Sequence, residues 1–177
     1  MPSTNARTSG RTSTTRARSR KEHDPIELLK ADHKKVDRMF KDFEKKKEKD
    51  REAAIELVEQ ILMELTVHAQ IEEEIFYPTM RESGGDAMTE LLDEAEVEHM
   101  TAKDLIAQLS SMSPDEDLYD AKVKVLGEYV KHHVKEEEDE IFPKAKKADV
   151  DMEELGSMLL ERKQELMQEM NGGAVAS

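Results

Sequence analysis

The sequence predicts an all-α protein, built as an up-down-up-down four-helix bundle with an additional C-terminal helix. Apolar residues recur in alternating steps of three and four along four long segments, which is the spacing of a helix face that packs inside a bundle. Charged residues make up 38% of the 177 residues and aromatic residues only 4%, with seven glycines and five prolines. This composition favours helices and leaves little material for β-turns.

The first two helices have clear start signals. Asp24 followed by Pro25 opens the first, because a capping side chain precedes a proline at the first helical position. Its apolar face reads Ile26, Leu29, His33, Val36, Phe40 and Phe43. The second helix begins near Asp50, and Pro78 with residues 83–85 is expected to close it.

Three further helices complete the predicted architecture. The third begins near Asp86, and Ser113-Pro114 is expected to end it and to open the fourth. Pro143 is expected to end or kink the fourth helix. A fifth amphipathic segment covers about residues 151–170. The short connections between helices of similar length predict antiparallel neighbours.

We therefore expect one bundle domain over residues 23–147, with a helix over residues 148–171 packed on it and a frayed tail over residues 172–177. Residues 1–22 are predicted to form a disordered basic tail, since they show no clear amphipathic pattern. The alternative for this tail is a mitochondrial transit peptide, because it is rich in Ser, Thr and Arg. Its basic residues are Arg7, Arg11, Arg16, Arg18, Arg20 and Lys21.

Charge and composition exclude several classes of protein. The chain has no cysteine, which excludes disulfides, thiolate nucleophiles and cysteine-based metal sites. Its formal net charge is −14 although the tail is basic, so the bundle is a poor nucleic-acid binder and suits cations, while a tail contact with nucleic acid stays open. No run of about 18 apolar residues is present, so no membrane span is expected. A cytoplasmic location is the expectation, with mitochondrial targeting as the alternative.

Six positions of the apolar faces hold polar residues instead. Each bundle helix supplies one histidine, and two helices add a glutamate four residues later, on the same face. The six residues are His33, His68, Glu72, His99, His133 and Glu137. Burying carboxylates without a partner is costly, and clustered histidines and carboxylates are the material of metal sites. The alternative is a metal-free bundle that pairs protonated histidines with these glutamates.

Two metal ions fit this set better than one, because glutamates from opposite helices can bridge a pair of ions. Imidazole and carboxylate ligands suit iron and manganese, and zinc is the alternative. The eleven methionines are expected to fill gaps in the core.

Two registers compete on the fourth helix, one with His132 and one with His133 on the bundle face. The stretch from His68 to Pro78 and the stretch that ends at Pro143 nearly repeat each other. In both halves a histidine stands ten residues before the proline, which selects His133.

The stretches LLKADHKKVDRMF, HAQIEEEIFYP, EVEHMTAKDLI and HHVKEEEDEIFP occur in this order. Together they resemble the four helix motifs of the hemerythrin-like HHE cation-binding domain, over about residues 24–147. The resemblance implies a hemerythrin-like bundle with a carboxylate-bridged pair of non-haem iron ions. It also implies a ligand set in which His33 and His68 bind one iron, His99 and His133 bind the other, and Glu72 and Glu137 bridge them.

One feature departs from the family pattern. Oxygen-carrying hemerythrins have a second histidine on the third helix, four residues from the first, and Lys103 stands at that spacing here. Glu96 or Glu73 is a candidate replacement ligand, although a solvated charge beside the bundle face is the ordinary reading of each. The other acids of the two repeated stretches are expected on a solvated face: Glu74, Glu138, Asp139 and Glu140.

The function expected from this resemblance is the binding of oxygen, peroxide or nitric oxide at a di-iron centre. Peroxide disproportionation in a stress response is the expected reaction, and whether the protein is an enzyme stays open. The alternative function is a metal- or redox-sensing module whose stability and partner binding depend on metal occupancy.

Overall fold

The computed structural model describes residues 23–173. The predicted basic tail over residues 1–22 and the last residues of the predicted frayed tail, 174–177, lie outside this part of the chain. The described residues contain helices and turns and no strand, so the all-α prediction is confirmed.

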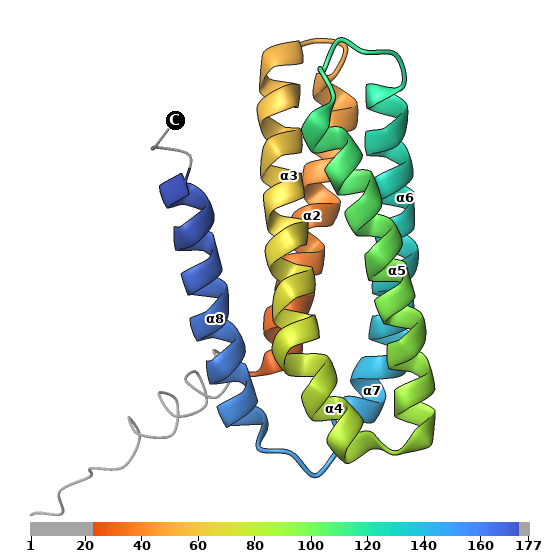
Figure 1. Cartoon of the computed structure of the whole chain (residues 1–177), viewed down its shortest axis with the longest axis vertical. Coiled ribbons are helices and arrows are strands. Elements are labelled where there is room, and N and C mark those ends of the chain that lie inside the picture. The colour runs from red at the N-terminus through yellow and green to blue at the C-terminus, as the bar shows by residue number, and fades with distance from the viewer. Residues whose placement is uncertain (1–22, 174–177) are drawn as a thin grey trace, which may run out of the picture.

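Four long helices lie side by side and form the bundle, and the chain turns at alternate ends between them (Figure 1). They are α2 (Pro25–Lys46), α3 (Arg51–Ile71), α5 (Asp86–Ser111) and α6 (Tyr119–Glu136). A fifth long helix, α8 (Met152–Gly173), packs against α2 and α3 on the outside of the bundle.

The first two bundle helices begin where the capping residues predict. The Asp24 carboxylate accepts hydrogen bonds from the backbone N–H groups of Ile26, at 2.9 Å, and Glu27, at 3.2 Å. The Asp50 carboxylate accepts one from the backbone N–H of Ala53, at 3.1 Å. Such caps satisfy donors that the first helical turn leaves without partners.

The fourth bundle helix starts later than expected. The prediction that Ser113-Pro114 opens it is wrong, because α6 begins only at Tyr119 and turns occupy the residues before it. The Glu116 side chain accepts a hydrogen bond from the Ser113 backbone N–H at 2.7 Å, which stabilises a turn instead of a helix start. Leu118 has a φ of 74°, a left-handed conformation that separates this turn from α6.

Two short π-helical segments continue the second and fourth bundle helices. Segment η1 covers Glu72–Phe76 and is followed by α4 (Tyr77–Gly84), whereas η2 covers Glu137–Ile141 and is followed by α7 (Phe142–Ala145). In each case the backbone N–H of the residue after the segment bonds five residues back, from Tyr77 to Glu72 and from Phe142 to Glu137. π-Helical turns of this kind occur frequently at functional sites.

The π segments explain why the two prolines do not break their helices. Pro78 and Pro143 are each the second residue of the helix that follows a π segment. A proline there removes a backbone donor. The widened turn lies directly before each proline and absorbs the change in hydrogen bonding. The helix therefore continues past Pro78 and stops only before Gly85, whose φ of 69° suits glycine.

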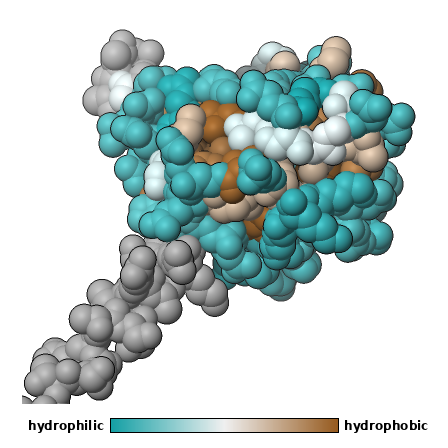
Figure 2. Space-filling model, turned by 90° about the horizontal axis from the view of Figure 1, so that it is seen from below, coloured by the Kyte–Doolittle hydropathy of each residue, from teal (hydrophilic) through white to brown (hydrophobic). Residues whose placement is uncertain are grey.

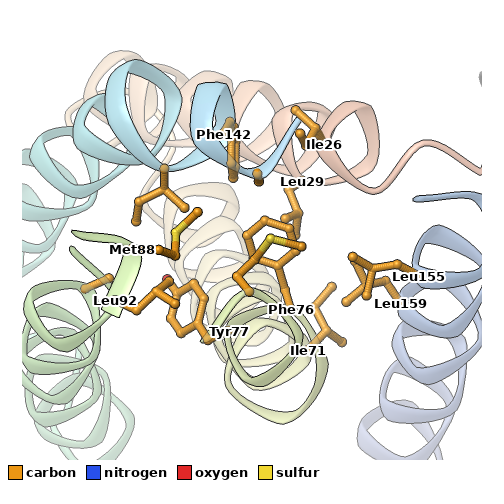
Figure 3. Packing of buried hydrophobic residues seen from close by; sticks show 14 of the residues in the cluster. Ile26, Leu29, Ile71, Phe76, Tyr77, Met88, Leu92, Phe142, Leu155 and Leu159 are labelled. Atoms are coloured by element: carbon orange, nitrogen blue, oxygen red, sulfur yellow. The ribbon is translucent and has the colours of Figure 1, made fainter. Parts of the chain in front are cut away.

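The apolar core forms two clusters, one towards each end of the bundle. The first surrounds Phe76 and Phe142 and includes Leu155 and Leu159 of α8 (Figure 3). Along α2, Leu29 belongs to the first cluster and Val36 to the second. Each large apolar side chain that is fully buried contributes about 1.5–3 kcal/mol to stability. His33 lies between Leu29 and Val36, so the polar positions separate the two apolar clusters.

One end of the bundle has a surface of mixed hydropathy. Figure 2 views the end at which α4 and α7 lie, and apolar side chains reach the surface there among hydrophilic ones. Within the part of the chain that the structure describes, none of the helices combines the length and apolar character that crossing a membrane requires.

Gly156 allows α8 to approach the start of α2 closely. A Cβ atom at this position would lie 1.7 Å from the backbone carbonyl oxygen of His23, so one of the two backbones would have to move. We expect Gly156→Ala to destabilise the protein by about 1–3 kcal/mol, measured by chemical denaturation. Gly172→Ala is the matched control, because a Cβ there meets nothing within 4 Å. A loss of stability no larger than that of the control would contradict the prediction.

Candidate metal centre

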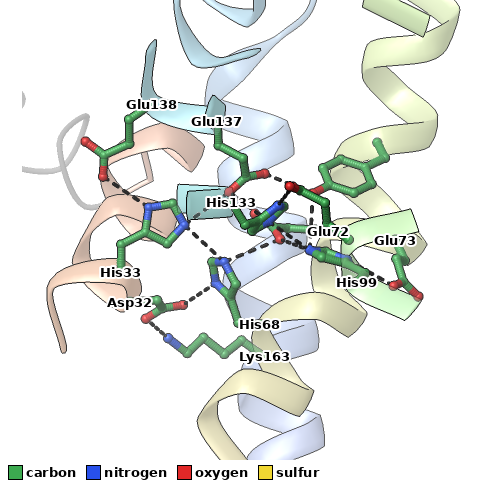
Figure 4. Close-up of polar contacts among 12 residues, drawn as sticks. Asp32, His33, His68, Glu72, Glu73, His99, His133, Glu137, Glu138 and Lys163 are labelled. Carbon is green, nitrogen blue, oxygen red and sulfur yellow. Dashed lines mark hydrogen bonds and ion pairs between the residues drawn. The ribbon is translucent and has the colours of Figure 1, made fainter. Parts of the chain in front are cut away.

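The six polar residues of the bundle faces converge on one point in the interior (Figure 4). Four are histidines from the four bundle helices, and the two glutamates are the first residues of η1 and η2. The residues are His33 (α2), His68 (α3), His99 (α5), His133 (α6), Glu72 (η1) and Glu137 (η2). None is more than 7% exposed, and both glutamates are fully buried. The structure thus brings together all six predicted residues.

The Nε2 atoms of the histidines meet in two pairs. His33 and His68 approach to 3.1 Å, and His99 and His133 approach to 3.0 Å. The carboxylates lie between the pairs. Glu72 Oε2 is 3.3 Å from His68 Nε2 and 3.4 Å from His99 Nε2, whereas Glu137 Oε2 is 3.2 Å from His33 Nε2 and 3.5 Å from His133 Nε2. Each glutamate therefore contacts one histidine of each pair.

The opposite nitrogen of every histidine faces a second carboxylate. These outer contacts are His33 Nδ1 to Glu138 at 3.1 Å, His68 Nδ1 to Asp32 at 3.5 Å, His99 Nδ1 to Glu73 at 3.0 Å and His133 Nδ1 to Glu98 at 2.7 Å. A carboxylate at Nδ1 orients the ring, favours a proton on Nδ1 and leaves the Nε2 lone pair free. All four Nε2 lone pairs can then point into the centre.

The outer carboxylates connect the helices crosswise. Asp32 precedes His33 in the chain but contacts His68, and Glu98 precedes His99 but contacts His133. In the same way, Glu138 of η2 contacts His33 of α2. The α2–α3 half and the α5–α6 half therefore repeat one arrangement.

Burial and charge act strongly on the carboxylates of the centre. Burial and the neighbouring charge of Glu137 raise the pKa of Glu72 well above its ordinary value. Burial also disfavours the ionised form of Glu137, but the charges of His133 and His33 outweigh it and lower the pKa of Glu137. The protein alone therefore does not supply enough positive charge to ionise both carboxylates.

The histidines respond to the same environment. Burial lowers the pKa of His68 to about 4, although the Asp32 carboxylate opposes this shift. At His33 and His133 burial also disfavours the charged ring, but nearby carboxylates outweigh it and raise the pKa. The neutral imidazole that binds metals is thus the ordinary state of His68 at neutral pH.

Unpaired buried oxygen atoms show that the donor set fits cations. Both oxygens of Glu72 and Oε2 of Glu137 are buried and accept no hydrogen bond from the described residues. A buried carboxylate without a partner costs several kcal/mol, and a coordinated cation would remove that cost. The donor atoms of His33, His68, Glu72 and Glu137 lie within 4.8 Å of one another, as do those of Glu72, His99 and His133. Two adjoining groups that share Glu72 suit two cations.

Residues 24–145 match the model of the hemerythrin HHE cation binding domain. The chain belongs to this family. A curated relative, described as a DNA nickase of Nostoc sp. (strain PCC 7120 / SAG 25.82 / UTEX 2576), is 31% identical over 116 residues. That match covers 66% of this chain and 32% of the relative, so the chain spans about a third of the relative's length.

A solved structure confirms the fold of the HHE domain. The crystal structure of a hemerythrin HHE cation binding domain-containing protein from Mycobacterium kansasii aligns with a TM-score of 0.57 and 22% sequence identity. The alignment covers 84% of this chain and 85% of that chain. Family membership and the buried histidine and glutamate clusters both point to metal binding.

Tyr77 is a residue of the HHE centre that the sequence did not reveal. Its hydroxyl donates a hydrogen bond to Glu137 Oε1 at 2.9 Å and lies 3.3 Å from His99 Nε2. Burial and the nearby carboxylates raise the pKa of this phenol, so it keeps its proton. In the other half Phe142 stacks on His33 with ring centroids 5.7 Å apart. The two halves therefore differ by one phenol oxygen.

The candidate replacements for the fifth histidine lie outside the HHE centre. Glu73 contacts the outer nitrogen of His99 and forms an ion pair with Lys103 Nζ at 2.6 Å. Glu96 forms an ion pair with Arg81 at 2.9 Å on the surface. Lys103 therefore neutralises an outer carboxylate of the centre.

The expectation that Glu138 lies on a solvated face holds only in part, because its side chain is 28% exposed but also contacts the outer nitrogen of His33. Glu74 does lie on the surface, where it pairs with Arg162 of α8 at 2.7 Å. The sequence did contain a signal, since each of four centre residues has an acid as a chain neighbour. Those neighbours are Asp32, Glu73, Glu98 and Glu138.

Proposed function

We propose that the chain is a non-haem di-iron protein of the hemerythrin-like class that binds oxygen, peroxide or nitric oxide, with peroxide disproportionation as its reaction. The observation that carries the proposal is the convergence of four imidazoles on two buried glutamates, three of whose four carboxylate oxygens lack hydrogen-bond partners among the described residues. Iron is the ion of choice for this donor set, with manganese or zinc as alternatives.

The proposed roles follow the two groups of donor atoms. His33 and His68 would hold one ion and His99 and His133 the other, with Glu72 and Glu137 shared between them. Asp32, Glu73, Glu98 and Glu138 would orient the four rings. The metal-binding unit would be the bundle over residues 23–147, with the following helix covering it, and we expect it to act in the cytoplasm.

A bound iron pair would supply redox chemistry and open coordination positions. The protein itself orients the ligands, holds a proton near the centre and provides a cavity of limited size. The Tyr77 hydroxyl holds a proton at Glu137 Oε1 in the interior. A cavity of about 40 Å³ adjoins the centre, with His33, His68, His99 and His133 in its wall and mostly apolar side chains around them. Since one water needs about 10–15 Å³, this space suits molecules of two to four atoms.

The test is iron content together with optical spectra before and after peroxide. We expect about two iron ions per chain and an absorption band that peroxide changes, with oxygen evolved from peroxide. His133→Ala should lose iron, whereas His23→Ala, at a histidine that lies outside the centre and contacts Ser157, should keep it. Less than one iron per chain, with no oxo-to-iron band after iron loading, would overturn the proposal.

The alternative function is a metal- or redox-sensing module. It is favoured by the contact of Lys163 of α8 with Asp32, which in turn contacts His68 and so links the outer helix to the centre. Deleting residues 1–21 separates the two functions, because peroxide chemistry would survive and a tail-dependent partner would be lost. DNA nicking is not proposed for this chain, because it matches only 32% of the curated relative and carries a net charge of −14.

A further inference from the structure

A third group of metal-binding side chains lies outside the centre, at the α5–α6 surface. Glu98, His132 and Glu136 place their donor atoms within 4.8 Å of one another. His132 Nε2 is 3.1 Å from Glu136 Oε1 and 3.7 Å from Glu98 Oε1. The second distance is too long for a hydrogen bond. It is slightly longer than the separation of about 3.3–3.6 Å between two tetrahedral ligands of one ion at metal–ligand distances of about 2.0–2.2 Å, so a small side-chain shift would bring both atoms to one ion.

This group differs from the other outer carboxylates in lacking a lysine partner among the contacts that the structure describes. Three of the four outer carboxylates have a lysine partner: Lys163 contacts Asp32, Lys30 contacts Glu138 and Lys103 contacts Glu73. Glu98 is the counterpart of Asp32 in the repeated arrangement, and it faces His132 and Glu136 instead. Asp32 therefore has a lysine as its partner, whereas Glu98 has an imidazole and lies near a second carboxylate.

We propose that Glu98, His132 and Glu136 bind a divalent transition-metal ion of the Zn²⁺ class. His132 and Glu136 stand one turn apart on α6, and Glu98 approaches from α5, so the three ligands clamp an ion from two helices. One imidazole and two carboxylates suit zinc, manganese or ferrous iron. Three protein ligands leave at least one position for water.

Glu98 would connect this outer ion to the interior. Its side chain is buried, and its Oε2 accepts a hydrogen bond from His133 Nδ1 at 2.7 Å while Oε1 faces His132. An ion on Oε1 draws negative charge away from Oε2 and weakens the bond to His133. Outer occupancy would therefore change the optical spectrum of the inner metal. This consequence rests on the proposed function, whereas the outer site itself does not.

The test is calorimetric titration of Zn²⁺ into the purified full-length protein with its own metal retained. We expect about one further ion per chain, and His132→Ala or Glu136→Gln should weaken its binding at least about tenfold. His23→Ala and Glu128→Gln are the matched controls, because they remove a histidine and an α6 glutamate away from the group. Both controls should bind as the wild type does.

Iron measured in the same samples separates the outer site from the inner centre. Iron unchanged while Zn²⁺ binds supports an outer site, and iron released in step with bound Zn²⁺ overturns it. Absence of Zn²⁺ binding, or equal binding by His132→Ala and the controls, also overturns the outer site. A protein that takes up no iron on loading but still binds Zn²⁺ through His132 would refute the di-iron proposal and support the outer site.

Discussion

Glu72→Gln is expected to remove most of the bound metal and leave the fold intact. Both oxygens of Glu72 are buried without hydrogen-bond partners, and Oε2 stands between one histidine of each pair. Glutamine has the same shape but supplies no charge and only one oxygen acceptor, so it cannot bridge two cations. We expect metal affinity to fall by at least about 10–100-fold, measured as iron per chain.

The control for this variant is Glu140→Gln, which removes an exposed acid of η2. It should retain iron. Circular dichroism should show the same helix content in both variants, because a neutral amide costs less to bury than a carboxylate. Full iron content in Glu72→Gln would show that Glu72 is not a bridging ligand and would favour the metal-free alternative.

Removing the metal from the wild type is expected to cause a large loss of stability. The stripped centre would leave two buried carboxylates in contact with the same histidines, with three oxygen atoms lacking hydrogen bonds. Breaking a buried charge arrangement costs about 3–5 kcal/mol. For a chain of this size, that loss corresponds to a decrease in Tm of about 6–20 °C. Thermal unfolding with and without a chelator measures it.

Glu72→Gln again provides the matched control, because it has already lost the metal. The chelator should leave its Tm unchanged, and that Tm should exceed the value of the stripped wild type. The first result follows because the variant has no metal left to remove. The second follows because an amide is neutral when buried, whereas Glu72 must take up a proton to become neutral once the metal is gone. An unchanged Tm of the wild type after verified metal removal would indicate a bundle held by histidine–glutamate pairs alone.

Periodicity predicted the bundle and the six converging residues because they occupy regular positions of straight helices. His33 and His99 follow apolar neighbours at steps of three and four, and the near-repeat around His133 resolved the choice against His132. The structure places His132 on the surface, with a side chain 62% exposed, and His133 in the interior. The meeting of these histidines in the interior was predictable because each bundle helix supplies one histidine at a similar position along the bundle.

Sequence reasoning missed residues whose positions are set by π-helical turns or by contacts between distant segments. The π-helical turn of η1 adds a residue to the helical turn and shifts the buried face, so Tyr77 becomes fully buried while Ile75 is only partly buried. A proline follows each π segment, but a proline alone does not distinguish such a turn from the end or kink of a helix. The crosswise contacts of Asp32 and Glu138 also join segments far apart in the chain, and only the packed arrangement reveals them.

The repeated arrangement of the two halves has a consequence for the order of folding. The pair α2 and α3 and the pair α5 and α6 are helical hairpins whose contacts are local in the chain, so each can form rapidly. Their shared centre requires both hairpins, because Glu72 and Glu137 each contact a histidine of the opposite half. Docking of the hairpins is therefore expected to be the slow step of folding, and a metal ion bound between them would slow their separation.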